Sequence, residues 1–362
     1  MIMKKRDLSD SKKDFQASLL TWFEEHQRKL PWRGVQDPYL IWVSEVMLQQ
    51  TQVIKVIDYY QKFIERFPNV QQLADAPLQD VLKVWEGLGY YARARNLHRA
   101  ATTVMTELDG EIPKEYDVFR KLPGVGDYSA AAVLSIAFNE PYAAVDGNIK
   151  RVLSRLHQLE TPVNDTASTK VFQQHADEIL DTQRPGLFNQ AMMELGATIC
   201  RPQSPTCLVC PVKTYCEVFH NNSQSEYPKR RTTKAIPEHQ MAAAVIYRES
   251  KVLLIQRPLE GLLGGLWEFP SGRLTENETL EKGCFRIINE TVNVSISNLQ
   301  YLTRVKHAFT HFKIVVDVFK CDYDSGEVVL DGPIDAKWVG VTEVSKYPLP
   351  RATHKFLEKS GL

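Results

Sequence analysis

Four of the six cysteines in this chain fall between residues 200 and 216. Their spacing is C-x6-C-x2-C-x5-C, at Cys200, Cys207, Cys210 and Cys216. In a reducing compartment such a cluster is more typical of a metal site than of two disulfides. A loop that must bring four thiols to one metal constrains the fold around it. Cys284 and Cys321 stand alone among apolar neighbours, and we expect both to be small buried side chains.

Length and composition indicate a globular protein of about two domains. The 362 residues would make domains of roughly 150 residues each, and 43% hydrophobic with 24% charged residues exclude a mostly disordered chain. Lys+Arg and Asp+Glu both total 44, so any nucleic-acid contact must depend on local basic groups. No stretch approaches the ~18 apolar residues of a membrane span. The basic start has no apolar segment behind it, so we expect a cytoplasmic protein with no signal peptide and no membrane partner.

Residues 15 to about 220 have the periodicity of a helical domain. Apolar residues recur at helical spacing at Phe15, Leu19, Leu20 and Phe23. Asp37-Pro38 is typical of a helix start, because Asp caps free N–H groups and Pro lacks an N–H where none is needed. Further helices are expected over 78–85, 90–107, 114–121, 127–138, 148–158, 168–180 and 186–198.

The pattern changes after a polar, basic segment at 222–238, which we interpret as a linker. Beyond it, two apolar runs at 241–247 and 251–257 flank a short polar turn and predict a β-hairpin. A helix over 277–292, strands over 299–309, 312–321 and 336–340, and a closing helix from Pro350 are expected next. The predicted organisation is multidomain: an all-α domain over 1–221, the linker, and an α+β domain over 239–362.

Three short motifs in the helical part carry candidate chemistry. The LPGVG segment at 122–126 lies between two predicted helices, and its glycines allow a tight turn that exposes backbone N–H groups to a phosphate. Asp146 precedes a helix start, where it is either an N-cap or a catalytic carboxylate. Glu45 lies amid apolar residues. Against apolar walls it would have a raised pKa and serve as a general acid, whereas on a polar face it would be an ordinary exposed glutamate.

Together these motifs resemble the helix-hairpin-helix DNA glycosylases of the endonuclease III superfamily, and among them the MutY-type adenine DNA glycosylases. The segments that carry the resemblance are SEVMLQQTQV (44–53), GLGYYARARNLHRAA (87–101), AVDGNIKRVLSR (144–155) and FNQAMMELGATIC (188–200). The resemblance spans the first 220 residues and is looser beyond them. It implies that a mispaired adenine is flipped out of the duplex and its N-glycosidic bond hydrolysed.

Within this resemblance, Glu45 would protonate the adenine, and Asp146 would stabilise the positively charged sugar left behind. Tyr128 and Asn148 would support the Asp146 carboxylate. Glycosylases that also cut the strand carry a lysine at the position of Tyr128, and its amine forms a Schiff base with the sugar. A tyrosine cannot form one, which favours base removal alone over combined glycosylase and lyase activity.

The resemblance also implies contacts with DNA and with a cofactor. Arg33 and Gln190 would line the base pocket. The residues implied to bind or distort the duplex are Gln50, Thr51, Leu88, Tyr90, Leu122, Gly124 and Gly126. For the cysteines at 200–216 the resemblance implies a 4Fe–4S cluster, because their uneven spacing differs from the paired C-x2-C knuckles that zinc usually takes.

The C-terminal domain contains an incomplete Nudix box that begins at Gly272. The positions that fit the box are Gly272, Glu278, Arg286 and Glu290. Two further acidic positions are Ile287 and Thr291, and the final glycine is Asn293, so the carboxylate cluster that would hold Mg²⁺ is depleted. We expect a MutT-like fold that serves recognition without hydrolysis.

A short segment of this domain occupies the family's recognition-loop position. It consists of Phe309, Thr310 and His311. The resemblance implies that the Thr310 hydroxyl and the His311 imidazole contact 8-oxoguanine opposite the adenine, while Phe309 anchors the loop. Many members carry serine where this chain has Thr310.

The predicted function is therefore a monomeric, monofunctional adenine DNA glycosylase that acts on duplex DNA containing 8-oxoguanine:A or G:A mispairs and associates with the nucleoid. Three alternatives remain: an endonuclease III-type glycosylase and lyase, a non-catalytic Fe–S DNA-binding module, and a Nudix hydrolase. Tyr128 disfavours the first alternative, Glu45 with Asp146 the second, and Ile287 with Thr291 the third.

Overall fold

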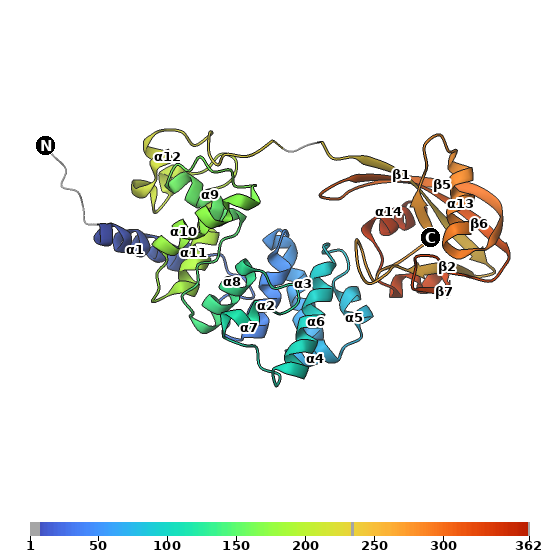
Figure 1. Cartoon of the computed structure of the whole chain (residues 1–362), viewed down its shortest axis with the longest axis horizontal. Helices are drawn as coiled ribbons and strands as arrows, with labels where there is room; N and C mark the ends of the chain where they lie inside the picture. The colour runs from blue at the N-terminus through green and yellow to red at the C-terminus, as the bar shows by residue number, and fades with distance from the viewer. Residues whose placement is uncertain (1–7, 233–234, 361–362) are drawn as a thin grey trace. The chain divides into compact units, whose positions relative to one another are not determined.

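The computed structural model describes residues 8–232 and 235–360, and the chain forms two compact units (Figure 1). The first unit consists of the residues up to Ala74 and of the segment that starts at Arg99 and ends in the predicted linker. The second combines Asp75–His98 with the C-terminal part of the chain. Residues 75–98, which the sequence analysis assigned to the helical domain, thus group with the C-terminal residues. Among the described residues, no helix is both long and apolar enough to span a bilayer.

The regular structure described before the linker is helical. The α-helices are α1 (Leu8–His26), α2 (Pro38–Leu48), α3 (Val53–Arg66), α4 (Val70–Asp75), α5 (Leu78–Val84), α6 (Ala92–Glu107), α7 (Tyr116–Phe119), α8 (Asp127–Phe138), α9 (Gly147–Leu156), α10 (Thr169–Ile179), α11 (Pro185–Thr198) and α12 (Glu217–His220). Short 3-10 turns, η1 (Thr166–Ser168), η2 (Cys207–Val209) and η3 (Lys213–Tyr215), lie among them.

Helix α2 starts as its sequence predicts. The side chain of Asp37 accepts a hydrogen bond from the backbone N–H of Tyr39 at 2.8 Å, and Pro38 occupies the first helical position. Residues 41–47 of this helix are all buried, because it packs against α8 on one side and α3 on another. Glu45, which lies within this stretch of α2, is therefore held in an apolar environment.

The LPGVG segment forms the turn between α7 and α8. Its Gly124 has a φ of +77°, in the left-handed region that side chains disfavour, and the Val125 N–H donates to the Leu122 carbonyl at 3.1 Å. Gly126 then occupies the N-cap position of α8. The helix predicted over 114–121 is shorter than expected, because it ends at Phe119 and the chain turns at once into this hairpin.

A mixed sheet forms the centre of the second unit. Its strands are β1 (Glu238–Arg248), β2 (Lys251–Gln256), β3 (Trp267–Glu268), β4 (Ser271–Arg273), β5 (Ser295–Ala308), β6 (Lys313–Ser325) and β7 (Asp335–Gly340). The main path runs β3-β2-β1-β6-β5, with β4 paired to β1 and β7 paired to β2. The pair β1–β6 is parallel and the others are antiparallel. The short strands β3 and β4 and the start of β5 at Ser295 were not predicted.

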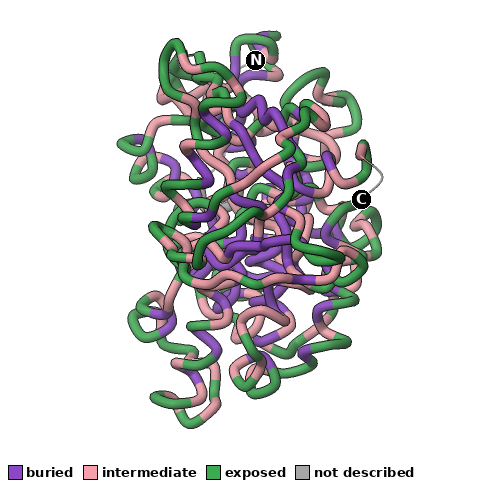
Figure 2. Tube along the Cα trace, turned by 90° about the vertical axis from the view of Figure 1, so that its right-hand side faces the viewer, coloured by how far each residue is buried: buried purple, intermediate pink, exposed green. Residues whose placement is uncertain are grey.

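Both faces of this sheet are covered. Helix α13 (Leu280–Val292) packs on one face and helix α14 (Arg351–Ser360) on the other. Alternate residues of β1 point to the two sides: Ala244 and Ile246 toward α13, and Ala243 and Val245 toward α14. In Figure 2, buried stretches of the trace lie in the interior and exposed residues gather on the outer turns. As predicted, Cys284 and Cys321 are buried side chains, and both pack in the layer beneath α13.

Candidate active site

Glu45 is a buried carboxylate on α2. Glu45 is only 5% exposed, and its Oε2 accepts a hydrogen bond from the Tyr128 hydroxyl on α8 at 2.8 Å. Burial raises the pKa of Glu45 to about 7, the hydrogen bond from Tyr128 opposes the rise, and the charge of Asp146 adds to it. A carboxyl group with this pKa is substantially protonated at neutral pH, as a general acid must be. The exposed alternative considered from the sequence is thus wrong.

Asp146 is both the N-cap of α9 and a wall of the same cavity. Its Oδ1 accepts from the Ile149 N–H at 2.7 Å, and its Oδ2 accepts from Asn148 Nδ2 at 2.8 Å. Burial raises the pKa of Asp146, while these hydrogen bonds oppose the rise. The two roles considered from the sequence are therefore compatible. The helix start fixes the carboxylate in place and supplies donors that favour its ionised form.

A glycine on α11 permits the close approach that fixes this arrangement. A Cβ added at Gly196 would lie 2.7 Å from the Cβ of Asn148. No larger residue fits there unless α9 and α11 separate. Arg151 Nη2 donates to Asn148 Oδ1 at 2.9 Å and to the Gly196 carbonyl at 2.7 Å, which locks the amide that holds Asp146.

The predicted catalytic and base-pocket residues converge on one cavity of about 140 Å³. Those of its lining residues that were predicted are Arg33, Glu45, Thr51, Tyr128, Asp146, Asn148 and Gln190. The sequence alone could not show that α2, α8, α9 and α11 bring them together. The cavity combines apolar walls with two carboxylates, which suits a substrate with a flat leaving group and a developing positive charge.

Sequence reasoning missed a buried ion-pair network at the edge of this cavity. Glu194 is 1% exposed, and its carboxylate accepts from Arg28 Nε at 2.7 Å and from Arg33 Nη2 at 2.6 Å. Burial alone would raise the pKa of Glu194, but the hydrogen bonds from the two arginines lower it. The network fixes the Arg33 guanidinium, which also donates to the Arg28 carbonyl. One signal was available: Glu194 is a lone charge in the apolar helix α11.

Two of the residues implied to contact DNA have unusual backbone conformations. Gln50 has a φ of 56° and Tyr90 a φ of 50°, both in the left-handed region that non-glycine residues seldom adopt. Such conformations cluster at functional sites. Gln50 is exposed after α2, and Tyr90 lies in the second unit, where its hydroxyl hydrogen-bonds Thr310 Oγ1 at 2.7 Å. Leu88 is buried, so it is not poised as a wedge in this conformation.

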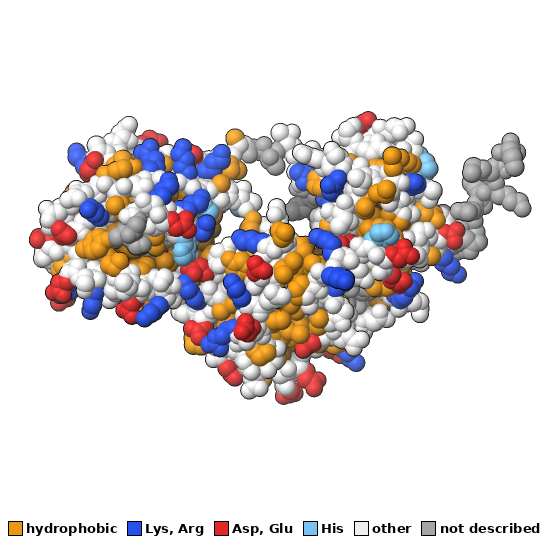
Figure 3. All heavy atoms as spheres, turned by 180° about the vertical axis from the view of Figure 1, so that it is seen from behind, with side chains coloured by type: hydrophobic (Ala, Val, Ile, Leu, Met, Phe, Trp, Pro, Cys, Tyr) orange, Lys and Arg blue, Asp and Glu red, His pale blue; other side chains and the backbone are white. Residues whose placement is uncertain are grey.

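On the face drawn in Figure 3, surface charge does not by itself mark a nucleic-acid site. On the side drawn in Figure 3, Lys and Arg side chains alternate with Asp and Glu side chains. This distribution agrees with the formal net charge of +0. A contact with phosphates would then depend on local groups such as the backbone N–H groups at the start of α8, where the N-cap Gly126 provides no side-chain cap.

The four cysteines at 200–216 lie on one loop that packs against the helical core. Cys200, Cys210 and Cys216 contact that core, and Arg155 Nη1 donates to Cys200 Sγ at 3.3 Å. Burial raises the pKa of Cys210 to about 12, and the charges of the other three thiols add to it. Within residues 8–232 and 235–360, however, no three His, Cys, Asp or Glu side chains have the arrangement that would hold a metal ion.

The loop implied to recognise 8-oxoguanine, which contains Phe309, Thr310 and His311, connects β5 to β6. The Phe309 N–H donates to the Phe312 carbonyl at 2.8 Å, and the two rings lie 4.8 Å apart. Thr310 and His311, between them, are exposed. The loop therefore has an aromatic base and a polar tip, as the sequence analysis expected.

The remaining acids of the Nudix box are held by one arginine. Arg286 Nη2 contacts Glu278 Oε2 at 2.8 Å, and its Nη1 contacts Glu290 Oε2 at 2.7 Å. The hydrogen bond from Arg286 lowers the pKa of Glu278 to about 2. Ile287 is buried against Gly272, where the box would carry an acid. Both remaining acids, Glu278 and Glu290, are thus paired with Arg286 within the domain.

Comparison with known proteins agrees with this geometry. Residues 43–179 match the "HhH-GPD superfamily base excision DNA repair protein" family, and residues 241–359 match the "NUDIX domain" family. An adenine DNA glycosylase from Homo sapiens is 35% identical over 90% of this chain and 70% of its own length. One from Buchnera aphidicola subsp. Baizongia pistaciae is 35% identical over 84% of each chain. A solved thermostable thymine-DNA glycosylase superposes with a TM-score of 0.54 at 29% identity, covering 59% of this chain and all of its own.

Fold and site thus define a helix-hairpin-helix base excision repair protein with an appended Nudix-like domain. More narrowly, the chain belongs to the adenine DNA glycosylase family. The resemblance, the fold class and the enzyme class inferred from the sequence are confirmed. The roles of individual residues, the cluster and the base opposite adenine stay predictions.

Proposed function

We propose that this protein hydrolyses the N-glycosidic bond of adenine paired with 8-oxoguanine or guanine in duplex DNA, without cutting the strand. The observation that carries the proposal is that one cavity holds both buried Glu45, with a pKa of about 7, and Asp146, the N-cap of α9. One group is ready to donate a proton, and hydrogen bonds favour the charged form of the other. This is the division of labour that cleavage of a glycosidic bond requires.

In this mechanism the mispaired adenine leaves the stack and enters the cavity, which costs a few kcal/mol and is easiest at a mispair. The Glu45 carboxyl protonates the leaving base through one oxygen, while the Tyr128 hydroxyl holds the other carboxyl oxygen, Oε2, in position. The Asp146 carboxylate then stabilises the positive charge that develops on the sugar. The hydrogen bonds from Asn148 and Ile149 keep it oriented as water attacks.

Base removal without strand cleavage follows from the residue at position 128. A lyase needs an amine there to form a Schiff base. The Tyr128 hydroxyl is instead bound to Glu45, and burial raises the pKa of this phenol. It therefore serves as a hydrogen-bond donor and not as a nucleophile.

The recognition loop supports discrimination of the opposite base. Thr310 and His311 are exposed at its tip and offer a hydroxyl and an imidazole to a base edge. The loop's aromatic base, Phe309 on Phe312, holds that tip in place. We further propose that the protein acts as a monomer, in the cytoplasm on nucleoid DNA.

We also propose a 4Fe–4S cluster held by Cys200, Cys207, Cys210 and Cys216. The donor set supports this proposal: four thiols lie on one loop with the spacing C-x6-C-x2-C-x5-C, and each would bind as a thiolate. The cluster, when bound, would supply a rigid tie for the loop and no step of the hydrolysis. A zinc ion is the alternative occupant. Iron and sulfide analysis of the purified protein, with a visible absorption band, distinguishes the two.

The catalytic assignment is tested by replacing each carboxylate with its amide. Glu45→Gln and Asp146→Asn are expected to abolish adenine release from an 8-oxoguanine:A duplex while DNA retention in a gel-shift assay survives. The matched control is Glu107→Gln, an exposed residue on α6 that should behave as wild type. Full activity in either active-site variant would contradict the proposal.

A further inference from the structure

The segment 75–98 belongs to the second unit, although the rest of that unit begins only at Lys234. The segment contains α5, the first part of α6 and, between them, the turn at residues 87–90. This turn carries Leu88 and Tyr90, two of the residues implied to distort DNA. The contacts that fasten the turn to the second unit therefore decide where Tyr90 lies, and the mechanism described above gives them no role.

The 87–90 turn is braced from within. Trp85 is fully buried, and its Nε1 donates to the Gly89 carbonyl at 3.1 Å. The same carbonyl accepts from Arg93 Nη2 at 3.1 Å, and the Tyr91 hydroxyl accepts from the Gly87 N–H at 3.0 Å. The turn is therefore stiff, and a displacement of the residue that precedes it displaces the whole turn.

Glu86, directly before this turn, is tied to the chain around the start of α14. Its Oε1 accepts from the Leu349 N–H at 2.7 Å and from His354 Nε2 at 2.9 Å. Its Oε2 contacts Lys83 Nζ at 2.5 Å, and Lys83 also donates to the Tyr347 carbonyl at 3.1 Å. Burial would raise the pKa of Glu86, but these hydrogen bonds lower it overall. The ionised carboxylate thus joins the turn to α14 through several charge-assisted bonds.

A second set of contacts joins the segment 75–98 to the chain between β2 and β3. Gln79 Nε2 donates to the Gly265 carbonyl at 2.9 Å, and Gln79 Oε1 accepts from Trp267 Nε1 at 3.0 Å. Arg95 Nη1 donates to the Gly264 carbonyl at 2.9 Å. Gln79 precedes the 87–90 turn and Arg95 follows it, so the segment is held on both sides of the turn.

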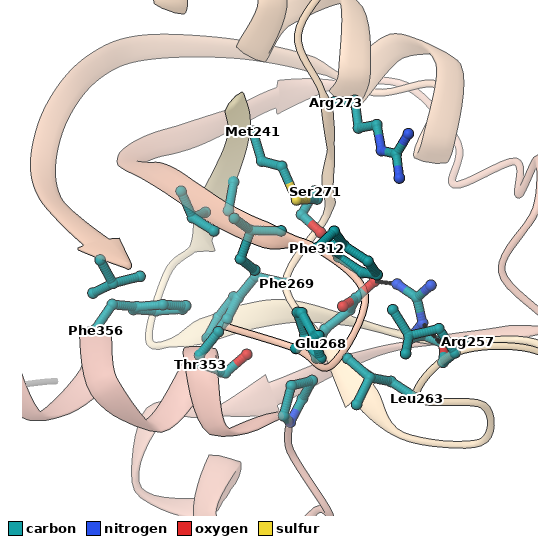
Figure 4. Close-up of a pocket in the computed structure, with 18 residues that line it drawn as sticks. Met241, Arg257, Leu263, Glu268, Phe269, Ser271, Arg273, Phe312, Thr353 and Phe356 are labelled. Carbon is teal, nitrogen blue, oxygen red and sulfur yellow. Dashed lines mark hydrogen bonds and ion pairs between the residues drawn. The ribbon is translucent and has the colours of Figure 1, made fainter. Parts of the chain in front are cut away.

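The two stretches that receive these contacts also reach the recognition loop. They wall an aromatic cavity of about 170 Å³ to which the β2–β3 loop contributes Leu263 and α14 contributes Thr353 (Figure 4). The aromatic base of the recognition loop lines the same cavity. At the tip of that loop, Thr310 Oγ1 lies 2.7 Å from the Tyr90 hydroxyl. The 87–90 turn and the recognition loop are therefore parts of one connected body.

We propose that Glu86 is a positioning residue for discrimination of the base opposite adenine, an inference that rests on the proposed function. Because Glu86 holds the 87–90 turn on α14, Tyr90 stays at the tip of the recognition loop, and the two meet the DNA together. Holding both in place beforehand removes the entropy cost of ordering them at the DNA. Without this tie, adenine removal continues, but its preference for 8-oxoguanine:A over G:A weakens.

The test compares single-turnover rates of adenine release from 8-oxoguanine:A and G:A duplexes of otherwise identical sequence, with the full-length protein in excess. Glu86→Ala should lower the ratio of the two rates by roughly threefold or more, as expected for residues in one hydrogen-bond network. His354→Ala removes the partner on α14 and should lower the ratio as well. The control, Glu358→Ala, alters an exposed glutamate on the same helix that pairs with Arg351 and should leave the ratio unchanged.

Two further variants separate positioning from a general loss of structure. Glu86→Gln fills the same space and keeps an oxygen for the Leu349 N–H, so its ratio should lie closer to wild type than that of Glu86→Ala. Thr310→Ala tests the route of the effect. If Glu86 acts through the recognition loop, adding Glu86→Ala to Thr310→Ala should lower the ratio no further, whereas independent effects multiply.

The outcomes distinguish this inference from the proposed function. A wild-type ratio in Glu86→Ala, or effects of Glu86→Ala and Thr310→Ala that multiply, would overturn the inference and leave the proposed function intact. A ratio in Glu86→Gln no closer to wild type than that of Glu86→Ala would also count against it. No adenine release from either duplex by the wild-type protein would overturn the proposed function, and this inference with it.

Discussion

The hydrogen bond from Tyr128 to Glu45 makes a sharp prediction about pH dependence. The Tyr128 hydroxyl donates to Glu45 Oε2 at 2.8 Å and opposes the rise in pKa that burial causes. Tyr128→Phe removes the donor and leaves the ring in place. The pKa of Glu45 should then rise further, because its charged form loses a partner and keeps its desolvation cost.

The size of the change follows from the strength of that bond. A hydrogen bond to a charged group contributes about 1.5–3 kcal/mol, and 1.36 kcal/mol corresponds to one pKa unit. Glu45 is active when protonated, so the rate falls as pH rises through its pKa of about 7. In the variant this fall should occur roughly one to two pH units higher.

The assay is the single-turnover rate of adenine release, measured across the neutral and alkaline range with saturating enzyme. The control is Tyr116→Phe, whose hydroxyl contacts Asp127 at 3.5 Å outside the cavity and whose loss should leave the profile unchanged. An alkaline midpoint that does not move in Tyr128→Phe, or that moves to lower pH, would refute the assignment of Glu45 as the acid.

Three further predictions concern stability, discrimination and the cysteine loop. The pKa of Glu45 is about 7 in the folded protein, against an ordinary value of 4.5. Protonation of Glu45 therefore favours the folded state, and the free energy of unfolding falls as pH rises between these two values. Glu45→Gln should therefore raise the free energy of unfolding at pH 8 by up to roughly 3 kcal/mol in urea denaturation, and an equal or lower value would count against the buried carboxylate. Replacing both Thr310 and His311 with alanine should reduce the preference for 8-oxoguanine:A over G:A severalfold. An unchanged ratio of the adenine-release rates on the two mispairs would show that this loop does not discriminate between them. Cys210→Ser should lose the visible absorption band and lower the Tm, and a variant with full absorption would remove this cysteine from the ligand set.

Local chemistry explains which elements could be predicted. Asp37 with Pro38 starts α2, and Asp146 caps α9, because capping depends on residues within one helical turn. The apolar helix around Glu45 made this residue a candidate acid, although the sequence left open whether its side chain is buried or exposed. These signals are readable without any knowledge of distant contacts.

Long-range packing explains what could not be predicted. The ion pairs of Glu194 with Arg28 and Arg33 join residues far apart in the sequence. The burial of Leu88 likewise depends on tertiary packing, and the motif around it carries no sign of this. The cavity of about 170 Å³ in the second unit is lined by residues of the sheet and of α14. Its formation depends on the packing of α14 against the sheet, which no local sequence pattern encodes.

The most direct test of the central claim uses a duplex with one 8-oxoguanine:A pair and excess enzyme. The product is analysed on a denaturing gel with and without hot alkali. Cleavage of the adenine strand only after alkali is the predicted result, because base removal leaves an intact but alkali-labile strand. Cleavage without alkali would contradict the role assigned to Tyr128, and an uncut strand in both lanes would contradict the roles of Glu45 and Asp146.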